Sequence, residues 1–148
     1  MKRTLLALWL MISAFVCTNA GVVLPAIFSD HMVLEQNTRV KIWGWAKPKE
    51  MITITPSWGG EVVKARPGSD ASWSAEIVTP KAGGPYEITV KGHNEVTIHD
   101  VMIGEVWVCS GQSNMEWSVG AGFEGSDEVV AKASKPELRF FNVDYRTS

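Results

Sequence analysis

The residues best placed to do chemistry lie where an apolar run stops at a short polar sequence, Ser110-Gly-Gln-Ser-Asn114. The run from Val101 to Cys109 is too continuous for a strand with one face in water, so it predicts a buried strand. Gly111 permits a tight turn directly after that strand. A serine on such a turn exposes its hydroxyl oxygen, and the backbone N–H groups that follow can face a developing oxyanion. This position alone does not make the serine a nucleophile.

A longer block that contains this turn, Gly104-Glu-Val-Trp-Val-Cys-Ser-Gly-Gln-Ser-Asn-Met-Glu116, resembles the first block of the sialate O-acetylesterase family, within the wider SGNH hydrolases. The resemblance implies that Ser113 is the nucleophile and that its own N–H contributes to the oxyanion hole. In this family a glycine and an asparagine from later blocks complete the hole, and the base is a histidine of a late Asp-x-x-His block. No Asp in this chain has His three residues on, so the motif of the base is absent.

Ser110 is the rival nucleophile, because it also lies beside Gly111. We favour Ser113 because the family block places it at this position, and because a serine still paired in the strand has no exposed hydroxyl. Gly111, Gln112 and Asn114 are expected to support the loop, the two amides by hydrogen bonds. Asn114 is not the later asparagine that the family uses for its oxyanion hole.

The histidines of the chain do not suggest a second site. Ser29-Asp-His31 invites a triad interpretation, but successive residues of an extended chain alternate sides, so we expect a turn with an Asx hydrogen bond. His93 is expected in a turn and His99 at a strand end beside Asp100, and neither has the spacing of a metal pair. At about 3.3 Å per residue, a straight strand from His99 to Cys109 spans on the order of 30 Å, which would place His99 too far from Ser113 to be its base. We expect no metal and no cofactor.

Two carboxylates near the loop, Glu105 and Glu116, could suggest a glycosidase pair. Glu105 lies inside an apolar strand, however, and Glu116 has no identifiable partner, so a paired-carboxylate mechanism is not favoured. Trp117 either forms the floor of a sugar site or seals two domains together. The sequence leaves both roles open.

The first twenty residues are expected to be a signal peptide and not part of the fold. Lys2 and Arg3 precede an apolar run from Leu5 to Val16, and Thr18-Asn-Ala20 offers a small residue for cleavage after Ala20. The apolar run is short for a membrane span, and no later segment reaches the length required. The mature protein is therefore expected to be soluble and secreted or periplasmic, with no membrane partner.

Composition narrows the remaining possibilities. The 148 residues carry a formal charge of −2 with basic and acidic side chains interspersed, so nucleic acid is not expected as a partner. Lipid attachment at Cys17 is not favoured, because Val16 is bulkier than such processing sites usually accept. Removal of the signal leaves Cys109 as the only thiol, so no intrachain disulfide forms, and its apolar strand predicts an inert core residue.

Residues 21–100 predict an all-β sandwich of short strands and turns. In the strand Arg39–Trp45, alternation places Val40, Ile42 and Gly44 on one face and Lys41, Trp43 and Trp45 on the other. Trp73, Ala75 and Ile77 form the inward stripe of a later strand, and Tyr86, Ile88 and Val90 alternate in the next. The segments Leu24–Leu34, Val40–Gly44 and Gly84–Tyr86 resemble the β-sandwich that precedes the esterase domain in this family.

Residues 101–148 predict the beginning of an SGNH esterase domain. After a glycine-rich loop, Ser126 is expected to cap a helix that runs to about Ser134, and Leu138 to Val143 is expected to form a second strand. This order begins a parallel α/β layer, whose active sites lie beyond the carboxyl ends of the strands. The expected fold is thus a β-sandwich followed by the start of a truncated α/β/α SGNH hydrolase domain, and we expect the chain to be a fragment.

The function expected from this sequence is that of an exported serine esterase, which removes O-acetyl groups from sialic acids or related glycans through an acetyl-serine intermediate. The chain alone is expected to be inactive, because the histidine and aspartate lie outside it. One alternative is a deacetylase of acetylated plant polysaccharides such as xylan, which nothing in the sequence separates from the first. Another is a non-catalytic, secreted glycan-binding β-sandwich with four possible stacking platforms, Trp43, Trp45, Trp58 and Trp73.

Overall fold

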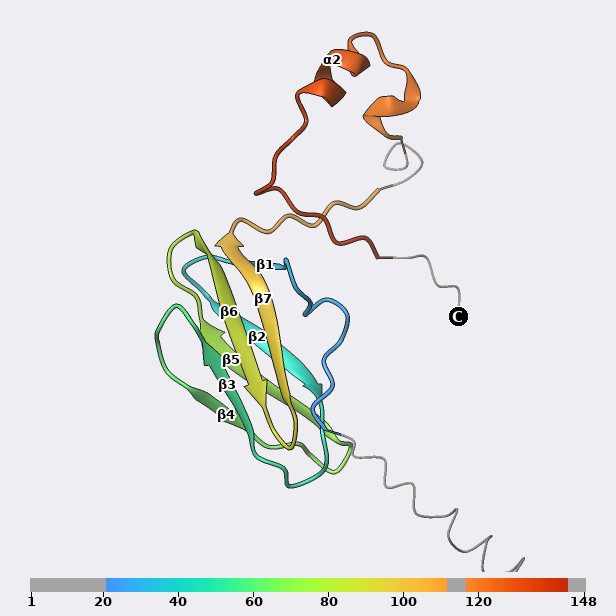
Figure 1. The fold of residues 1–148 in the computed structure, drawn as a ribbon. Helices are drawn as coiled ribbons and strands as arrows, with labels where there is room; N and C mark the ends of the chain where they lie inside the picture. The colour runs from blue at the N-terminus through green and yellow to red at the C-terminus, as the bar shows by residue number, and fades with distance from the viewer. Residues whose placement is uncertain (1–20, 112–116, 144–148) are drawn as a thin grey trace, which may run out of the picture.

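The computed structural model describes residues 21–111 and 117–143 of the chain (Figure 1). Its strands are β1 (Val33–Glu35), β2 (Arg39–Trp45), β3 (Ile52–Pro56), β4 (Val63–Ala65), β5 (Ser72–Val78), β6 (Gly83–Lys91) and β7 (Glu95–Gly104). A single 3-10 turn, η2 (Val119–Ala121), and one short helix, α2 (Ser126–Ala131), follow the strands in the described residues. The described chain is therefore mostly β.

The strands form two sheets that face each other (Figure 1). The larger sheet has five strands in the order β1-β7-β6-β3-β4, and the smaller sheet consists of β2 and β5. β1 pairs with β7 in parallel, and the other neighbouring pairs are antiparallel. The hairpin turn predicted at Gly92-His-Asn94 is confirmed, because it joins β6 to β7 and the N–H of Gly92 donates to the carbonyl of Asn94 at 2.8 Å.

Alternating apolar residues on both sheets build one core between them. The smaller sheet contributes Ile42, Trp73 and Ile77, all almost fully buried. The larger sheet contributes a set of buried β-branched residues: Ile52, Ile54, Ile88, Val90, Ile98 and Val101. The inward faces predicted for the Arg39–Trp45 strand and for the strand with Trp73 and Ile77 are confirmed, since a strand with one wet face must alternate in polarity.

The long buried strand predicted from Val101 to Cys109 is wrong beyond Gly104. β7 crosses residue 100, where we expected a domain boundary, and its last partners are Glu35 in β1 and Gly83 in β6. β1 ends there and β6 begins there, so no strand of the described chain pairs with the next residues. Residues 105–111 lie outside any strand, with Trp107 82% and Val108 93% exposed. Cys109 is exposed too, which overturns its predicted place in the core.

The region after residue 117 contains less regular structure than the sequence predicts. α2 ends at Ala131 and not near Ser134, and its N-cap is Gly125, so Ser126 is the first residue of the helix and not its cap. Residues 138–143 form no strand in the described chain, because no neighbouring strand offers them a backbone ladder there. Within residues 21–111 and 117–143, no helix is long and apolar enough to cross a membrane.

Candidate functional site

The predicted nucleophile lies outside the described residues. Ser113, Gln112 and Asn114 all fall between residues 111 and 117, so the roles assigned to them stay predictions. Gly111, the last described residue before them, is exposed and lies outside any helix or strand. Ser110 is equally exposed and unpaired in a ladder, which removes the argument that its hydroxyl is held in a strand. The family block is then the remaining reason to prefer Ser113.

The start of the segment that leads to Ser113 is anchored by Gln36, the residue after β1. Its backbone N–H donates to the carbonyl of Gly104 at 2.9 Å, and its Nε2 donates to Glu105 Oε1 at 2.7 Å. Gln36 Oε1 in turn accepts the N–H of Ala82 at 2.9 Å. The Glu105 carboxylate therefore serves to fix the chain as it leaves β7. Glu116, its candidate partner in a glycosidase pair, lies outside the described residues.

Asp100 in β7 binds two segments that are distant from it in sequence. Arg139 Nη2 donates to Asp100 Oδ1 at 2.9 Å and to Oδ2 at 3.0 Å, and Arg139 Nη1 donates to the backbone carbonyl of Asp100. His31 Nδ1 lies 2.5 Å from Asp100 Oδ2. The side chain of Arg139 is only 19% exposed. Asp100 thus ties the returning carboxyl-terminal segment and the loop before β1 to the strand that leads toward the block containing Ser113.

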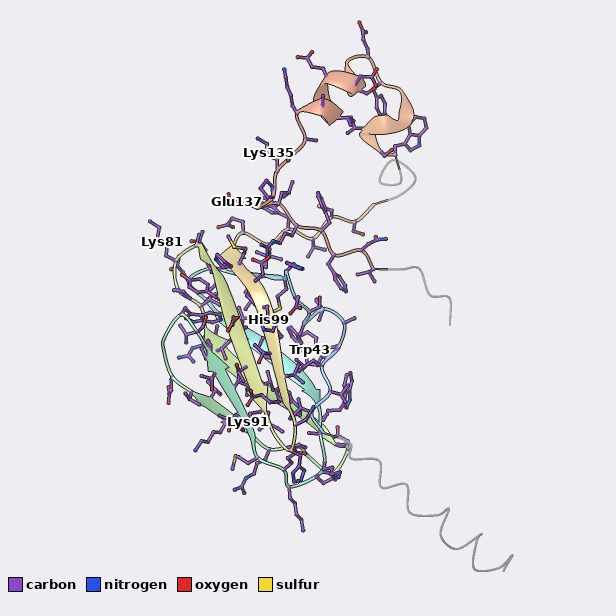
Figure 2. The ribbon with its side chains drawn as sticks, in the orientation of Figure 1. Trp43, Lys81, Lys91, His99, Lys135 and Glu137 are labelled. Atoms are coloured by element: carbon purple, nitrogen blue, oxygen red, sulfur yellow. The ribbon has the colours of Figure 1, made fainter. Side chains whose placement is uncertain are left out.

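A second pair joins Asp30 to His99, which Figure 2 labels on β7. Asp30 Oδ1 accepts the backbone N–H of His99 at 2.7 Å and lies 3.4 Å from His99 Nδ1. The backbone N–H of His31 donates to the carbonyl of His99 at 3.0 Å. Glu87 Oε1 lies 3.9 Å from the other ring nitrogen of His99. We expected an Asx bond within the turn, but the Asp30 carboxylate bonds across to β7.

These contacts show that Ser29, Asp30 and His31 do not form a triad. Asp30 binds His99, whereas His31 binds Asp100, so the two side chains have different partners. The turn itself is confirmed by a hydrogen bond from the N–H of Met32 to the carbonyl of Ser29 at 3.3 Å.

Both carboxylates are stabilised in the charged form. The hydrogen bond from His31, followed by that from Arg139, lowers the pKa of Asp100 below its ordinary value. The backbone hydrogen bond from His99 does the same to the pKa of Asp30. A general base works best when its pKa lies near the working pH. Neither carboxylate suits that role, and the two pairs act instead to position chain segments.

The Asp100–Arg139 and His31–Asp100 contacts were missed from the sequence. The partners stand 39 and 69 residues apart, and no local period connects them. One weak signal exists in the mirrored dipeptides Asp30-His31 and His99-Asp100, whose charges complement each other when the two segments lie side by side. Within the described residues, no group of three or more His, Cys, Asp or Glu side chains is arranged to hold a metal ion.

The tryptophans proposed as stacking platforms divide into two kinds. Trp73 is buried, and Trp58 is half-buried, with its Nε1 donating to the carbonyl of Val78 at 3.1 Å. Trp43 and Trp45 remain 38% and 45% exposed on the outer face of β2. Trp117 is exposed and stands 5.9 Å from Phe123, centroid to centroid. Of the four tryptophans proposed as stacking platforms, Trp43 and Trp45 therefore present the most ring surface to a ligand in the described structure, and Trp117 is exposed as well.

Comparison with known proteins identifies relatives for most of the chain. The chain is 32% identical to the sialate O-acetylesterases of Mus musculus and Rattus norvegicus over 146 residues, and each match covers 90% of this chain. The human sialate O-acetylesterase is 30% identical over 126 residues and covers 79%. A crystal structure of a carbohydrate acetylesterase from Xanthomonas citri matches 78% of the chain, with a TM-score of 0.71 and 29% sequence identity. No protein-family model matches the chain.

The matches cover only part of each relative. The chain spans 27% of the mouse enzyme and 26% of the bacterial structure. The match to the mouse enzyme leaves out only about a tenth of the residues of this chain. The block from Gly104 to Glu116 stands well inside both ends, so it falls within the match.

Proposed function

The chain is related to the sialate O-acetylesterases over most of its length, and on this basis we propose that it is part of an exported serine esterase that deacetylates sialic acids or related glycans. The observation that carries the proposal is the match to these enzymes across the Gly104–Glu116 block. The structural similarity to a carbohydrate acetylesterase supports it independently. We propose further that the chain forms a β-sandwich domain followed by the beginning of an SGNH esterase domain. The predicted ranges were 21–100 and 101–148, and we place the boundary after Gly104, where β7 ends.

In the proposed mechanism Ser113 Oγ attacks the carbonyl carbon of an O-acetyl group while a histidine accepts the hydroxyl proton. The backbone N–H of Ser113 donates to the oxyanion of the tetrahedral intermediate. Collapse breaks the bond to the sugar oxygen, which leaves as a hydroxyl with the proton from the histidine. Water then attacks acetyl-Ser113, releases acetate and restores the serine. No Asp of this chain has His three residues on, so we assign the base to another part of the protein.

The described residues would contribute positioning to this reaction. Gln36 fixes Gly104 and Glu105, and Asp100 joins β7 to the segment around Arg139. Gln36 holds the start of the stretch that contains Ser113, and Asp100, through Arg139, holds the segment that follows this stretch. Such anchoring matters because a nucleophile displaced by about 1 Å can lose roughly 100-fold in rate.

The test of the nucleophile compares two serine variants in the full-length protein. Ser113→Ala should lower kcat/KM for acetate release from O-acetylated sialic acid by roughly 10³-fold or more, because the variant lacks the hydroxyl on which the proposed acetyl intermediate forms. Ser110→Ala is the matched control and should stay within about tenfold of wild type. Brief exposure to substrate should also leave an acetyl group on the peptide that contains Ser113. Activity retained in Ser113→Ala but lost in Ser110→Ala would reverse the assignment.

The relatives are named for acetylated substrates of different breadth. The mammalian relatives are named for sialate, whereas the bacterial structure is named only as a carbohydrate acetylesterase. Loops around the site decide such specificity. We propose O-acetylated sialic acid first and acetylated polysaccharides such as xylan second. Acetate release from the two substrates by the same full-length enzyme, compared as kcat/KM, decides between them.

Export is proposed from the sequence of residues 1–20, which lie outside the described residues. Cleavage after Ala20 would give a mature protein that begins at Gly21 and is secreted or periplasmic. Amino-terminal sequencing of the protein recovered outside the cytoplasm tests this directly. A protein that retains Met1 would contradict it.

A further inference from the structure

The outer face of the two-stranded sheet carries a hollow separate from the Ser113 block. The hollow is open to solvent and has a volume of about 590 Å³. It is lined by Lys41, Trp43, Gly44, Trp45, Arg66, Ser72, Trp73 and Ser74. Figure 2 labels Trp43 on β2. The hollow uses β2, β5 and Arg66 just after β4, and none of its residues comes from the segment after β7. The hollow therefore shares no residue with the proposed esterase site.

Strand register explains why the indole rings of Trp43 and Trp45 stay partly exposed to solvent. Trp43 lies opposite Ser74 and Trp45 lies opposite Ser72 in the β2–β5 pair. A serine is too small to cover the face of a neighbouring indole, and its hydroxyl offers a hydrogen bond beside the ring. The two tryptophans share one side of β2 because they are two residues apart. The result is a pair of adjacent aromatic surfaces bordered by hydroxyl groups.

Contacts with the chain before β1 hold Trp43 and Trp45 in place. The ring of Phe28, itself buried, meets Trp43 edge to face, with centroids 4.5 Å apart and an interplanar angle of 77°. The backbone of Trp45 exchanges two hydrogen bonds with Val23, both of 2.9 Å. Side chains already fixed in the free protein lose less entropy when a ligand binds. The ring of Trp43 and the backbone of Trp45 are thus held in place in the free protein.

The charges that line the hollow are all positive. Lys41 and Arg66 contribute cations, and no carboxylate is among the lining residues. Glu76 faces Lys41 in the strand register, yet neither Lys41 nor Arg66 forms a salt bridge with any described residue. The protein as a whole carries a charge of −2, so the positive charge of this lining is opposite to the net charge of the protein. The lining complements a ligand with one or two negative charges.

We propose that this hollow binds an oligosaccharide that carries a carboxylate. The indoles of Trp43 and Trp45 stack on the apolar faces of two sugar rings, Ser72 and Ser74 hydrogen-bond to sugar hydroxyls, and Lys41 and Arg66 bind the carboxylate. The site is an accessory one, formed by residues of β2 and β5 together with Arg66 and by none of the residues assigned to the esterase reaction. It is argued from its own lining and does not depend on the esterase activity.

The experiment is a titration of the full-length protein after removal of its signal, using sialyllactose as the anionic probe and lactose as its neutral counterpart. Neither probe has an O-acetyl group, so failure of the esterase proposal does not affect the result. Saturable binding of sialyllactose is expected with a Kd of roughly 1 mM or below, and lactose should bind more weakly. The indole N–H resonances of Trp43 and Trp45 should shift during the titration, a readout that needs no variant.

Two variants and a control locate the site. Trp43→Ala with Trp45→Ala should weaken sialyllactose binding at least tenfold, and Lys41→Gln with Arg66→Gln should remove the preference for sialyllactose over lactose. Trp107→Ala is the matched control, since Trp107 is an exposed tryptophan outside the hollow, and it should bind as wild type does. The proposal is overturned if wild type shows no saturable binding, if other tryptophan resonances shift in place of these two, or if a folded double tryptophan variant binds unchanged.

Discussion

The carboxylate of Asp100 shows how one residue can organise segments that are remote in sequence. It accepts hydrogen bonds from Arg139 and lies within hydrogen-bond distance of His31, and it sits in the strand that leads toward Ser113. Its backbone has a φ of 53°, a left-handed conformation that Asp and Asn tolerate better than other residues with side chains. Its identity is therefore constrained by both its backbone and its charge.

We predict that Asp100→Asn lowers the melting temperature at neutral pH, and that this difference disappears in acid. Asn keeps the left-handed backbone and a hydrogen-bonding oxygen, so the substitution removes mainly the charge. The His31 and Arg139 contacts lower the pKa of Asp100 in the folded protein, so its stabilising contribution is complete above the unfolded pKa of about 3.9. The contribution is then lost as the pH falls through the folded pKa. Thermal melts of both proteins from pH 7 to pH 2 measure this.

The control for this prediction is salt. Asp100 is partly exposed, so added salt should reduce the difference between wild type and Asp100→Asn at pH 7. A difference in melting temperature that stays constant from pH 7 down to pH 2 would show that Asp100 acts through its shape and not through its charge.

At the scale of elements, the closure of β2 over the core depends on Gly44. The residue is buried, and Val23 pairs with the neighbouring Trp45 across an isolated bridge. A Cβ at position 44 would lie 2.3 Å from the carbonyl oxygen of Val23 and 3.2 Å from Trp73 Cζ2. A backbone oxygen cannot move aside as a flexible side chain can, so the chain before β1 would have to shift.

We predict that Gly44→Ala destabilises the protein by about 1–3 kcal/mol, the usual cost of overpacking. Gly104→Ala is the matched control, because a Cβ at the end of β7 meets no atom within 4 Å, and its effect should stay within about 0.5 kcal/mol. Urea unfolding followed by tryptophan fluorescence measures both. Equal stability of the two variants would show that the Val23–Trp45 bridge does not hold as described.

The strands that were predicted well are those whose own residues alternate. β2 has the predicted bounds, and Ile42, Trp73 and Ile77 point inward as expected, because one-sided burial leaves a local pattern of period two. The run after Gly104 misled because a continuous apolar sequence does not say where the partner strands end. The strand predicted at residues 138–143 was wrong for the same reason, since a strand requires a neighbouring strand that lies elsewhere in the sequence.

The candidate site was predicted from a sequence motif and not from the alternation that predicted the strands. A motif alone identified Ser113, and the described residues do not reach it. The Asp100 contacts could not be predicted, because they join residues 39 and 69 positions apart through the arrangement of the sheets. The hollow on β2 was foreseen in part, since alternation placed Trp43 and Trp45 on one face. Its positive lining depends on Arg66, which the fold brings there from beyond β4.

At the scale of the whole molecule, apolar residues are distributed unevenly between the two parts of the described chain. Every buried hydrophobic residue described lies between Val22 and Ile103. The remainder exposes a set of large apolar side chains: Val106, Trp107, Val108, Trp117, Val119, Phe123, Val129, Val130, Leu138, Phe140, Phe141 and Val143. Phe140 is 88% exposed. Soluble monomers rarely expose so much apolar surface in one region unless another surface covers it.

We predict that a protein of residues 21–148, studied alone, self-associates through the region after Gly104. Its apparent size on a sizing column should increase with concentration, and it should bind a hydrophobic dye such as ANS. A protein of residues 21–104 keeps the whole described core, so it should elute as a monomer, bind little dye and melt cooperatively. The contrary result is a sharp, concentration-independent monomer peak and a cooperative melt for residues 21–148. That outcome would mean that the apolar side chains after Gly104 cover one another within a single chain.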